Sequence, residues 1–495
     1  MIIVIVWRRD CRVTRSLQGV HFATFMGFWQ IGEYLVSRSA FISEIRTLGL
    51  LSLPMVFTQL CQMGMGVADV LMAGQVSAVD LAGVSLGGSL YWPAMLATSG
   101  LIMAVTPSVS QLHGAGRTSE SGEVVRQALW LALVGGGLGF WGLGFSQSVY
   151  EFAGVDPQGI PVAVEYLNWV RWGLLPVLGY FALRYLCDGL SWTLPAMLIA
   201  ASALIVKIPL NYLFIFGFDL GSYRFEAMGG AGAGPATAIV MTLELIAMLI
   251  VVRYSRINSS GFWLRFSWPD FSEISRLLKL GTPIAMAMFA EMAIFSAVTI
   301  LIGRMGVEAV AAHQVATSVS GVMFMIPLAL GMAASIRVGY NVGREDYVAA
   351  RRSGYVAICL SLGVSVIGVL VLLIWRGEIA GLYVPDAQVL GIATTLLLFA
   401  AAFQPFDSVQ VTTIGALRGY KDTRLPMIVA LFCYWGIALP VGVTLGFGLF
   451  GLPELGVSGF WTALVVGLSL AAVVLSVRFN RLSQQPMTIK AMALR

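Results

Sequence analysis

The sequence predicts an all-α polytopic membrane protein with twelve transmembrane helices arranged in two six-helix lobes. Of its 495 residues, 58% are hydrophobic and 11% are charged, whereas roughly a quarter of residues are charged in soluble domains. The chain also holds about twelve apolar segments long enough to cross a hydrocarbon core of about 30 Å. These segments are too long and too continuously apolar to be barrel strands, so we expect helices.

The predicted spans follow one another along the chain. In order they cover residues 46–72, 84–111, 126–149, 163–187, 194–216, 230–253, 277–303, 310–336, 354–375, 387–414, 425–449 and 457–477.

These spans divide into an N-lobe (residues 46–253) and a C-lobe (277–480), joined by a charged, aromatic cytoplasmic linker at 254–276. Residues 481–495 are predicted to be a cytoplasmic tail. Residues 1–45 are predicted to be an N-terminal cytoplasmic leader whose role stays open. The arginines of this segment follow its short apolar run instead of preceding it, so we expect no cleavable signal. An interfacial helix, or a stretch upstream of the true start, fits the segment equally well.

An internal repeat supports the division into two lobes. Four pairs of positions share nearly one spacing: Gly74 and Gly303 (303 − 74 = 229), Arg117 and Arg344 (344 − 117 = 227), Pro195 and Pro426 (426 − 195 = 231), and Gly217 and Gly446 (446 − 217 = 229). Because six spans is an even number, both halves enter the membrane from the same side. The lobes should therefore be related by a pseudo-two-fold axis along the membrane normal, with a central cavity between them.

The basic residues predict the orientation. Placing both termini in the cytoplasm leaves only Arg224, Arg304 and Arg376 in the main outer loops, and fills the inner loops with cations. These inner cations are Arg117, Arg126, Arg253, Arg256, Arg265, Arg276, Lys279, Arg344, Arg351, Arg352, Arg418, Lys421, Arg424, Arg478 and Arg481. The net charge of +5 therefore needs no nucleic-acid partner to explain it.

Asp407 is the strongest candidate functional residue. It lies near the end of an apolar run at 389–411, where an ionised carboxylate is costly unless it faces water, a partner or a cargo. Gln404 and Gln410 lie three residues to either side of it, so a helix would place all three on one face.

Two further acids are stranded in apolar spans. Asp69 has Gln62 two turns earlier on the same helix face. Glu291 has only apolar helical neighbours, among them Met288 and Phe295, so we expect it to hold its proton for part of the time near neutral pH. We expect the three acids to face one shared aqueous vestibule between the lobes.

Other polar residues are weaker candidates. Glu244 has no counterpart in the repeat and Asp188 is predicted to lie in a solvated loop, while Arg418 and its neighbouring cations are predicted to set topology. The five cysteines and three histidines are too scattered to form a disulfide framework or a metal-ligand set.

Several motifs resemble one known family. Residues 65–74 (MGVADVLMAG), 310–315 (VAAHQV), 331–339 (GMAASIRVG) and 415–422 (GALRGYKD) resemble the multidrug and toxic compound extrusion (MATE) transporters, and specifically their bacterial NorM branch. The resemblance covers roughly residues 46–480. It implies twelve helices in two lobes and an antiporter of the bacterial inner membrane, monomeric and with no cofactor beyond its coupling ion. Its cargo would be lipophilic organic cations, such as dyes and cationic antimicrobials, exported by alternating access.

The resemblance also implies site residues. The acidic positions of the family fall on Asp69, Glu291 and Asp407, the three acids that stand out on physical grounds. Lys207 departs from the pattern, because relatives usually carry asparagine there, while Asn211 is retained. We expect Lys207 to pair with Asp69, since a mid-membrane ammonium needs an acid close by.

The departures from the family pattern bear on the coupling ion, and other features of the sequence bear on the type of activity. An ammonium at Lys207 and the apolar Phe403 near Asp407 favour H⁺ over Na⁺ as the coupling ion. A flippase for lipid-linked precursors is the alternative, but it would need a basic cavity. A membrane-embedded enzyme would need clustered catalytic groups, and the sequence contains neither these nor an ATP-binding glycine-rich loop.

Overall fold

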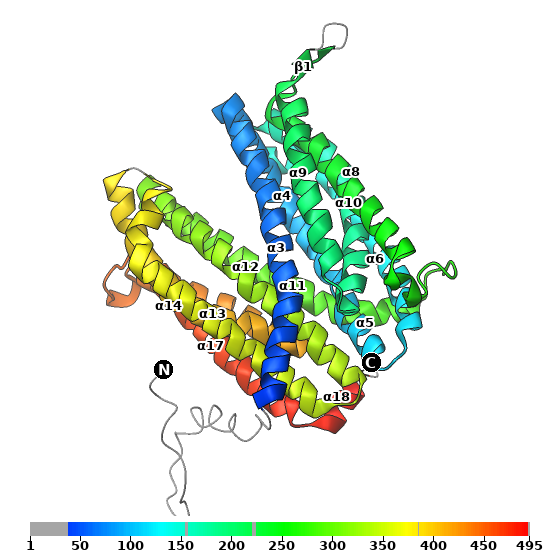
Figure 1. The fold of residues 1–495 in the computed structure, drawn as a ribbon. Helices are drawn as coiled ribbons and strands as arrows, with labels where there is room; N and C mark the ends of the chain where they lie inside the picture. The colour runs from blue at the N-terminus through cyan, green and yellow to red at the C-terminus, as the bar shows by residue number, and fades with distance from the viewer. Residues whose placement is uncertain (1–37, 154–156, 220–223, 385, 494–495) are drawn as a thin grey trace, which may run out of the picture.

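The computed structural model describes residues 38–153, 157–219, 224–384 and 386–493. The helices form two bundles, which lie close together at one end and diverge toward the end where β1 lies (Figure 1). The expectations for residues 1–37, which include most of the predicted leader, lie outside the described residues.

The N-lobe runs from α3 to α10. Its helices are α3 (Arg38–Val76), α4 (Ala78–Ile102), α5 (Val105–Gly114), α6 (Ser121–Leu143), α7 (Ser146–Phe152), α8 (Ile160–Gly189), α9 (Leu194–Phe216) and α10 (Ala233–Tyr254). Short 3₁₀ turns lie at η1 (Thr118–Glu120) and η2 (Gly229–Gly232). Between α9 and α10, β1 (Phe218–Asp219) and β2 (Arg224–Phe225) pair antiparallel, with Phe218 opposite Phe225.

The C-lobe follows the 3₁₀ turn η3 (Arg256–Ser260) of the linker. Its elements are α11 (Phe271–Ile302), η4 (Gly303–Met305), α12 (Val307–Gly343), α13 (Tyr347–Gly381), α14 (Ala387–Gly419), α15 (Arg424–Ala430), the π-helix η5 (Leu431–Ala438), α16 (Leu439–Gly446), η6 (Leu449–Gly451), α17 (Val457–Ser483) and α18 (Pro486–Ala493). Every predicted span coincides with a helix or with consecutive helical pieces, so the all-α fold class is confirmed. The first helix begins at Arg38, eight residues ahead of the span predicted from 46.

Eleven helices within the described residues are long and apolar enough to cross a membrane. The remaining predicted span, α8, is 30 residues long but carries four charged side chains, which lower its hydropathy: Glu165, Arg171, Arg184 and Asp188. Residues 177–189 of α8 are all buried against the rest of the N-lobe. The protein itself therefore shields the charges at this end of α8 from lipid.

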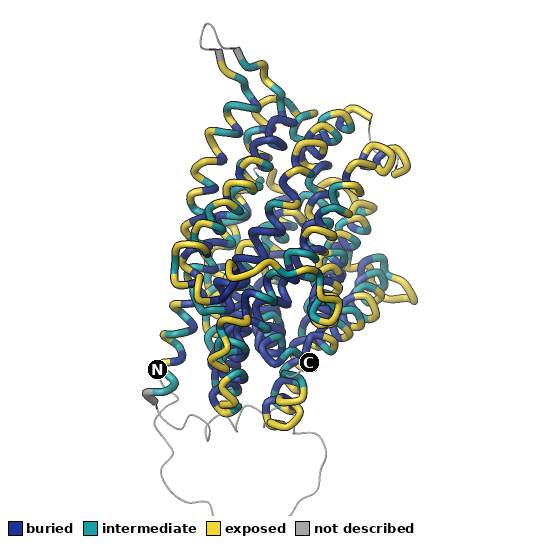
Figure 2. The backbone as a smooth tube through the Cα atoms, turned by 90° about the vertical axis from the view of Figure 1, so that its right-hand side faces the viewer, coloured by how far each residue is buried: buried dark blue, intermediate teal, exposed yellow. Residues whose placement is uncertain are grey.

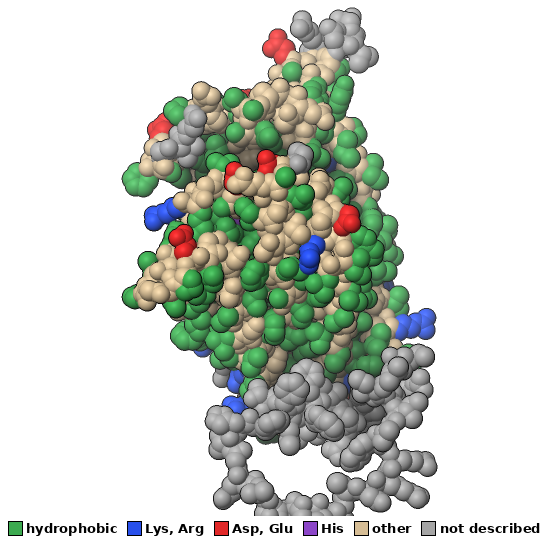
Figure 3. Space-filling view, turned by 90° about the vertical axis from the view of Figure 1, so that its left-hand side faces the viewer, with side chains coloured by type: hydrophobic (Ala, Val, Ile, Leu, Met, Phe, Trp, Pro, Cys, Tyr) green, Lys and Arg blue, Asp and Glu red, His purple; other side chains and the backbone are tan. Residues whose placement is uncertain are grey.

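Most of the outer surface suits a hydrocarbon environment. Hydrophobic side chains cover most of the face seen in Figure 3, where charged side chains are sparse. The buried residues lie on the helix faces that point into the bundles, and the exposed residues lie on the faces that point outward (Figure 2). This inside-out distribution of apolar surface is typical of a helical membrane protein.

Two loop conformations repeat in both lobes and support the duplication. After α5, Gly116 has a φ of +74°, and Glu345, 229 residues later (345 − 116), has a φ of +58°. After α8 and α14, Ser191 and Lys421, 230 residues apart (421 − 191), have φ values of +58° and +62°. In each case the next residue donates its N–H across five positions, as Asp422 does to the carbonyl of Leu417 at 3.0 Å. These are Schellman-type helix ends, each requiring one left-handed residue.

The two lobes meet through close helix crossings near the end predicted to be cytoplasmic. A Cβ placed on Gly100 of α4 would lie 2.7 Å from the Cα of Ala285 on α11. A Cβ on Gly114 of α5 would overlap the carbonyl of Tyr340 on α12. Gln111 adds a hydrogen bond from its Nε2 to the carbonyl of Gly419 at 2.9 Å. The lobes are therefore closed against each other at this end.

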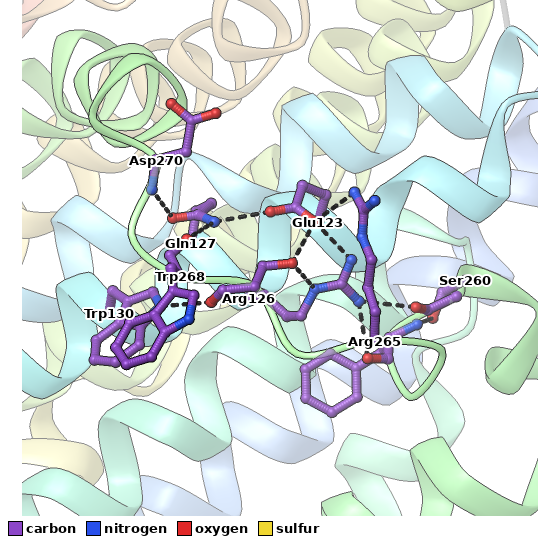
Figure 4. Close-up of polar contacts among 11 residues, drawn as sticks. Glu123, Arg126, Gln127, Trp130, Ser260, Arg265, Trp268 and Asp270 are labelled. Carbon is purple, nitrogen blue, oxygen red and sulfur yellow. Dashed lines mark hydrogen bonds and ion pairs between the residues drawn. The ribbon is translucent and has the colours of Figure 1, made fainter.

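The linker between the lobes is fastened to α6 (Figure 4). Arg126 Nη1 donates to the carbonyl of Phe262 at 2.9 Å. Gln127 donates to the carbonyl of Trp268 at 3.0 Å and accepts from the backbone N–H of Asp270 at 2.9 Å. Because the last of these contacts lies at the N-cap of α11, the linker holds the start of the C-lobe at a fixed place on the N-lobe.

The crossing of α12 and α14 inside the C-lobe gives a stability prediction. A Cβ on Gly415 would overlap the carbonyl of Gly331 and lie 2.6 Å from its Cα. Gly415→Ala should therefore push the two helices apart and cost about 1–3 kcal/mol, as overpacked sites do. The measurement is the thermal unfolding midpoint of the purified protein in detergent. Gly391→Ala on the same helix is the matched control, since nothing lies within 4 Å of its added Cβ, and equal midpoints for the two variants would contradict the prediction.

Candidate functional site

A row of buried polar side chains on α14 forms the first candidate site. Gln404, Asp407 and Gln410 are each only 2% exposed, and their spacing of three residues places them on one helix face, as predicted. Asp407 Oδ2, Gln404 Oε1 and Gln410 Oε1 all lack a hydrogen-bond partner in the described structure. Buried polar atoms left unpaired in this way are costly, so the row has the capacity to bind water, a proton or a cation.

Tyr434 completes this row from a neighbouring helix. Gln410 donates to its hydroxyl from Nε2, and Tyr434 lies in the π-helix η5. The next residue, Trp435, donates from its indole N–H to the carbonyl of Ala290 on α11 at 3.1 Å. π-Helical turns often occur at functional sites, and this one links the polar face of α14 to the residue beside Glu291.

Glu291 is a half-buried residue of α11. Its charge acts on Asp407 and on Tyr434, so the two acids of the C-lobe share one electrostatic environment. The positive charge of Arg418, at the end of α14, attracts the negative charge of Glu291. Arg418 Nη1 also lies 3.4 Å from the sulfur of Met103 in the N-lobe. The structure therefore places Arg418 between the lobes, where it does more than mark topology.

The apolar candidates near Glu291 divide between two cores. Met288 packs against the core that joins both lobes, whereas Phe295 packs against the core of the C-lobe alone. Both are partly buried, and they lie one turn to either side of Glu291 on α11. Phe403 is buried against Trp461, with ring centroids 6.4 Å apart, and offers no oxygen to a cation.

Asp69 lies in a second, separate site inside the N-lobe. Its Oδ1 accepts from Lys207 Nζ at 2.9 Å and from Asn211 Nδ2 at 2.7 Å. Lys207 also donates to the hydroxyl of Thr237 on α10, which lies 3.4 Å from Asp69 Oδ2. The predicted pairing of Lys207 with Asp69 is confirmed. Gln62, two turns earlier on α3, is half-buried and takes part in none of these hydrogen bonds among the described residues.

The shared vestibule expected for the three acids is therefore not what the structure shows. All the polar contacts of Asp69 come from α9 and α10 of its own lobe. Asp407 and Glu291 interact with each other in the other lobe. The described residues therefore form two polar sites: Asp69 is enclosed by helices of the N-lobe, whereas Asp407 and the half-buried Glu291 belong to the C-lobe.

The prediction that Asp188 is a solvated loop residue is wrong. Asp188 is 1% exposed at the end of α8, and its Oδ2 lies 3.7 Å from Nε of Arg184, one turn earlier. Arg184 donates from Nη2 to Gln59 of α3 at 3.1 Å. The helix simply continues further than the apolar run of the sequence, so both charges are carried inside the lobe.

Sequence reasoning missed two residues of these sites. Thr237 and Tyr434 have no charge and lie in apolar spans, where hydroxyl-bearing residues are common. No sequence signal distinguished them. Thr237, one turn from the start of α10, also hydrogen-bonds back to the carbonyl of Ala233 at 2.7 Å, as threonines in ordinary helices do.

Together, two bundles of membrane-crossing helices, each with acids in its interior, define a multi-pass membrane protein of the transporter class. The MatE family model matches residues 54–213 and 283–444, one match in each lobe. The chain belongs to the MATE family and is NorM-like. It is accordingly a transporter and not an enzyme.

Three curated relatives illustrate the similarity. The chain is 40% identical to the multidrug resistance protein PmpM of Pseudomonas aeruginosa, over 89% of this chain and 92% of PmpM. It is 40% identical to the probable multidrug resistance protein NorM of Xanthomonas campestris pv. campestris, over 90% and 96% of the two chains. It is 39% identical to the multidrug resistance protein MdtK of Yersinia pseudotuberculosis, over 90% and 97%.

Solved structures share the fold at lower sequence identity. The eukaryotic MATE transporter AtDTX14 superposes with a TM-score of 0.82 at 19% identity, covering 92% of this chain and all of that one. The bent form of the Vibrio cholerae MATE transporter VcmN gives a TM-score of 0.79 at 18% identity, covering 91% of this chain and all of that one. The twelve-helix, two-lobe architecture is therefore that of the family.

Proposed function

We propose that this protein is a proton-coupled multidrug antiporter that exports lipophilic organic cations across the bacterial inner membrane. The names of its relatives support multidrug efflux as the activity. The cargo class is inferred from charge: Asp407 of the C-lobe has an unpaired carboxylate oxygen and Glu291 lies in the same lobe, and carboxylates there would attract cations. We further propose a monomer with both termini in the cytoplasm, since the inner loops carry most of the arginines and lysines.

The observation that carries this proposal is the buried, incompletely hydrogen-bonded carboxylate of Asp407. Its carboxylate is buried, Oδ2 has no hydrogen-bond partner, and Glu291 adds a second negative charge nearby. Two carboxylates whose negative charges act on each other disfavour double ionisation, so the pair readily accepts either a proton or a cation. Competition between H⁺ and an organic cation for one pair of acids is the chemical basis of antiport.

The transport cycle then follows from alternating access. With the acids deprotonated and the lobes open to the cytoplasm, a lipophilic cation binds. The lobes rock to the outward-facing arrangement, where protons neutralise the acids and release the cargo. Each charge moved down 100 mV yields about 2.3 kcal/mol, to which the pH gradient adds. The driving force is therefore sufficient for uphill export.

Two features favour H⁺ over Na⁺. Lys207 supplies a positive charge to Asp69 at 2.9 Å, so a metal cation there would have to displace an ammonium. Phe403, one turn from Asp407, packs against Trp461 and provides no oxygen ligand. A proton needs no coordination shell, whereas Na⁺ does.

Ethidium efflux from proteoliposomes is the deciding experiment. Purified protein is reconstituted and loaded with ethidium, and efflux is followed first under an imposed pH gradient and then under an imposed Na⁺ gradient. We expect rapid efflux under the pH gradient and little under the Na⁺ gradient. Efflux driven only by Na⁺ would overturn the proposed coupling ion.

A flippase for lipid-linked precursors, the alternative within the broad superfamily, is less well supported. Recognition of a pyrophosphate needs free positive charge in the interior. Among the described residues, the buried cations Lys207 and Arg184 each have an acid partner, Asp69 and Asp188 respectively. In the described part of the N-lobe no buried cation is left over for a phosphate, and the charge of Glu291 acts on Arg418 between the lobes.

The closed end of the molecule gives a prediction for the rocking step. Glu44 of α3 accepts two hydrogen bonds from Arg337 of α12, at 2.9 and 2.8 Å, and a third from Ser353 at 2.7 Å. This bridge ties the N-lobe to the C-lobe, and charge-assisted hydrogen bonds contribute about 1.5–3 kcal/mol each. Glu44→Gln should therefore raise the population of the inward-open form by about tenfold or more.

Spin-label distances between the cytoplasmic ends of the lobes measure this population. Glu273→Gln is the matched control, because Glu273 forms a partly exposed ion pair with Arg276 inside α11 itself. If Glu44→Gln and Glu273→Gln gave the same distance distribution as the unmodified protein, the bridge would have no role in holding the outward-facing form.

A further inference from the structure

The N-lobe contains more buried acids than buried cations. Apart from Glu44, which pairs with the C-lobe, the charged side chains buried in the described part of residues 38–254 are three acids and two cations: Asp69, Asp188, Glu244, Arg184 and Lys207. We refer to these five residues as the N-lobe charge cluster. With all five ionised, the cluster would carry one net negative charge in the membrane interior. One proton bound to the cluster would neutralise it.

Glu244 is the acid that the two cations leave over. Lys207 pairs with Asp69 at 2.9 Å, and Arg184 lies 3.7 Å from Asp188. Glu244 is 3% exposed on α10, and its Oε1 has no hydrogen-bond partner within the described structure. A buried carboxyl without a counter-ion favours the protonated form, so the extra proton of the cluster belongs most naturally on Glu244.

Glu244 lies between the two ion pairs along the membrane normal. Thr237, which binds Lys207, is seven residues before Glu244, so the two share a face of α10 and are separated by about 10 Å of helix. Gln59, which binds Arg184, is ten residues before Asp69 on α3, or about 15 Å toward the cytoplasmic end. The cluster therefore forms a ladder along the membrane normal, in which Asp69 lies farthest from the cytoplasmic end and Asp188 lies closest to it.

The groups around Glu244 come from three neighbouring helices. Tyr180 and Arg184 of α8 and Lys207 of α9 interact with it electrostatically. Tyr91 of α4 does so as well, and its hydroxyl lies 3.4 Å from the sulfur of Met241, one turn before Glu244. Both cations of the N-lobe charge cluster, Arg184 and Lys207, therefore act on Glu244.

Unpaired polar atoms mark the path from Glu244 toward the cytoplasm. Tyr180 OH, Arg184 Nε and both carboxylate oxygens of Asp188 are buried and have no hydrogen-bond partner among the described residues. Such atoms are normally satisfied by ordered water. A short file of water along α8 would satisfy all of them and would also conduct protons.

We propose that Glu244 is a proton-relay site that connects the Asp69–Lys207 pair to the cytoplasmic end of the N-lobe. The inference rests on the proton coupling proposed above. A proton that reaches Asp69 from outside neutralises its carboxylate and frees the Lys207 ammonium. Glu244, which holds a proton at rest, first releases it to water on the cytoplasmic side, as its O–H bond breaks. The proton on Asp69 then passes along bridging water to the Glu244 carboxylate, since about 10 Å of helix separates Thr237 from Glu244, and the Asp69–Lys207 ion pair re-forms.

Infrared difference spectroscopy tests whether Glu244 holds a proton. The purified full-length protein, titrated between acidic and alkaline pH, should show carboxylic-acid carbonyl bands from its buried acids, and Glu244→Gln should remove one of them. Glu165→Gln is the matched control, because Glu165 is an exposed acid of α8. Glu244→Asp keeps an acid in a shifted position and should move the band. A carbonyl region that is the same in the unmodified protein, Glu244→Gln and Glu244→Asp overturns the proposal.

Transport in proteoliposomes tests whether the relay is used. Glu244→Gln should slow proton-driven ethidium efflux by about tenfold or more, since positioned proton-transfer groups contribute at least that much. Glu244→Asp should restore most of the rate. Unchanged efflux by Glu244→Gln, in a preparation whose wild type is proton-driven, overturns only the relay. A wild type driven by Na⁺ alone overturns the proton coupling on which the relay rests.

Discussion

Asp407→Asn should abolish ethidium export, with a residual rate at least about a hundredfold below that of the unmodified protein. Asparagine has the same shape as aspartate but no charge that changes with protonation, so both cargo attraction and proton exchange are lost at this position. An effect of this size corresponds to about 2.7 kcal/mol, well within the range of a charged interaction in a dry site. Energised everted membrane vesicles give the measurement directly, as ethidium uptake into the vesicle lumen.

Controls separate this effect from misfolding. The unpaired Oδ2 of Asp407 makes no hydrogen bond that an amide would break, so the variant should reach the membrane at normal levels. Glu378→Gln, an exposed acid at the end of α13, should export ethidium at the unmodified rate. Unchanged export by Asp407→Asn would show that the C-lobe acids are not the coupling site.

Lys207→Met should be the most destabilising single change in the N-lobe. Methionine matches the length of lysine but leaves the buried Asp69 carboxylate with only Asn211 and Thr237 as partners. Removing one member of a buried ion pair costs about 3–5 kcal/mol, because the remaining charge is not compensated. We expect a clear fall in the thermal unfolding midpoint of the purified protein in detergent.

A double variant identifies the cause. Lys207→Met combined with Asp69→Asn removes both charges and should recover most of the lost stability, because replacing a whole buried pair is often close to neutral. Lys279→Met, at an exposed position of α11, should leave the midpoint unchanged. If Lys207→Met proved as stable as the unmodified protein, Lys207 and Asp69 could not form a buried pair of two charged groups.

Much of the candidate site was accessible from the sequence. The cost of charge in an apolar span singles out Asp69, Glu291 and Asp407, and helix periodicity places Gln404 and Gln410 on the face of Asp407. The same cost predicts that Lys207 needs an acid, and the 2.9 Å pair with Asp69 bears this out. The shared helix face and the ion pair could be predicted because they concern single residues and local spacing, which the membrane environment restricts strongly; the roles of the three acids stay predictions.

The failures have a common origin in the packing of helices. Asp188 was placed in solvent because the apolar run ends beside it, yet helix α8 continues into the lobe and buries it. Thr237 and Tyr434 became site residues only through the approach of α10 to α3 and of η5 to α14. Hydroxyl groups carry no charge penalty, so nothing in a single span distinguishes those that meet a partner.

The sequence by itself determined the number of spans, the duplication and the residues too costly to bury without purpose. Hydrophobic length and charge placement decide these features one segment at a time, before any helix meets another. The tertiary structure alone decided that the acids belong to two sites, one inside each lobe, and that Glu244 is left without a counter-ion. These facts depend on distances between side chains far apart in the chain, which are set by the packing of helices against one another.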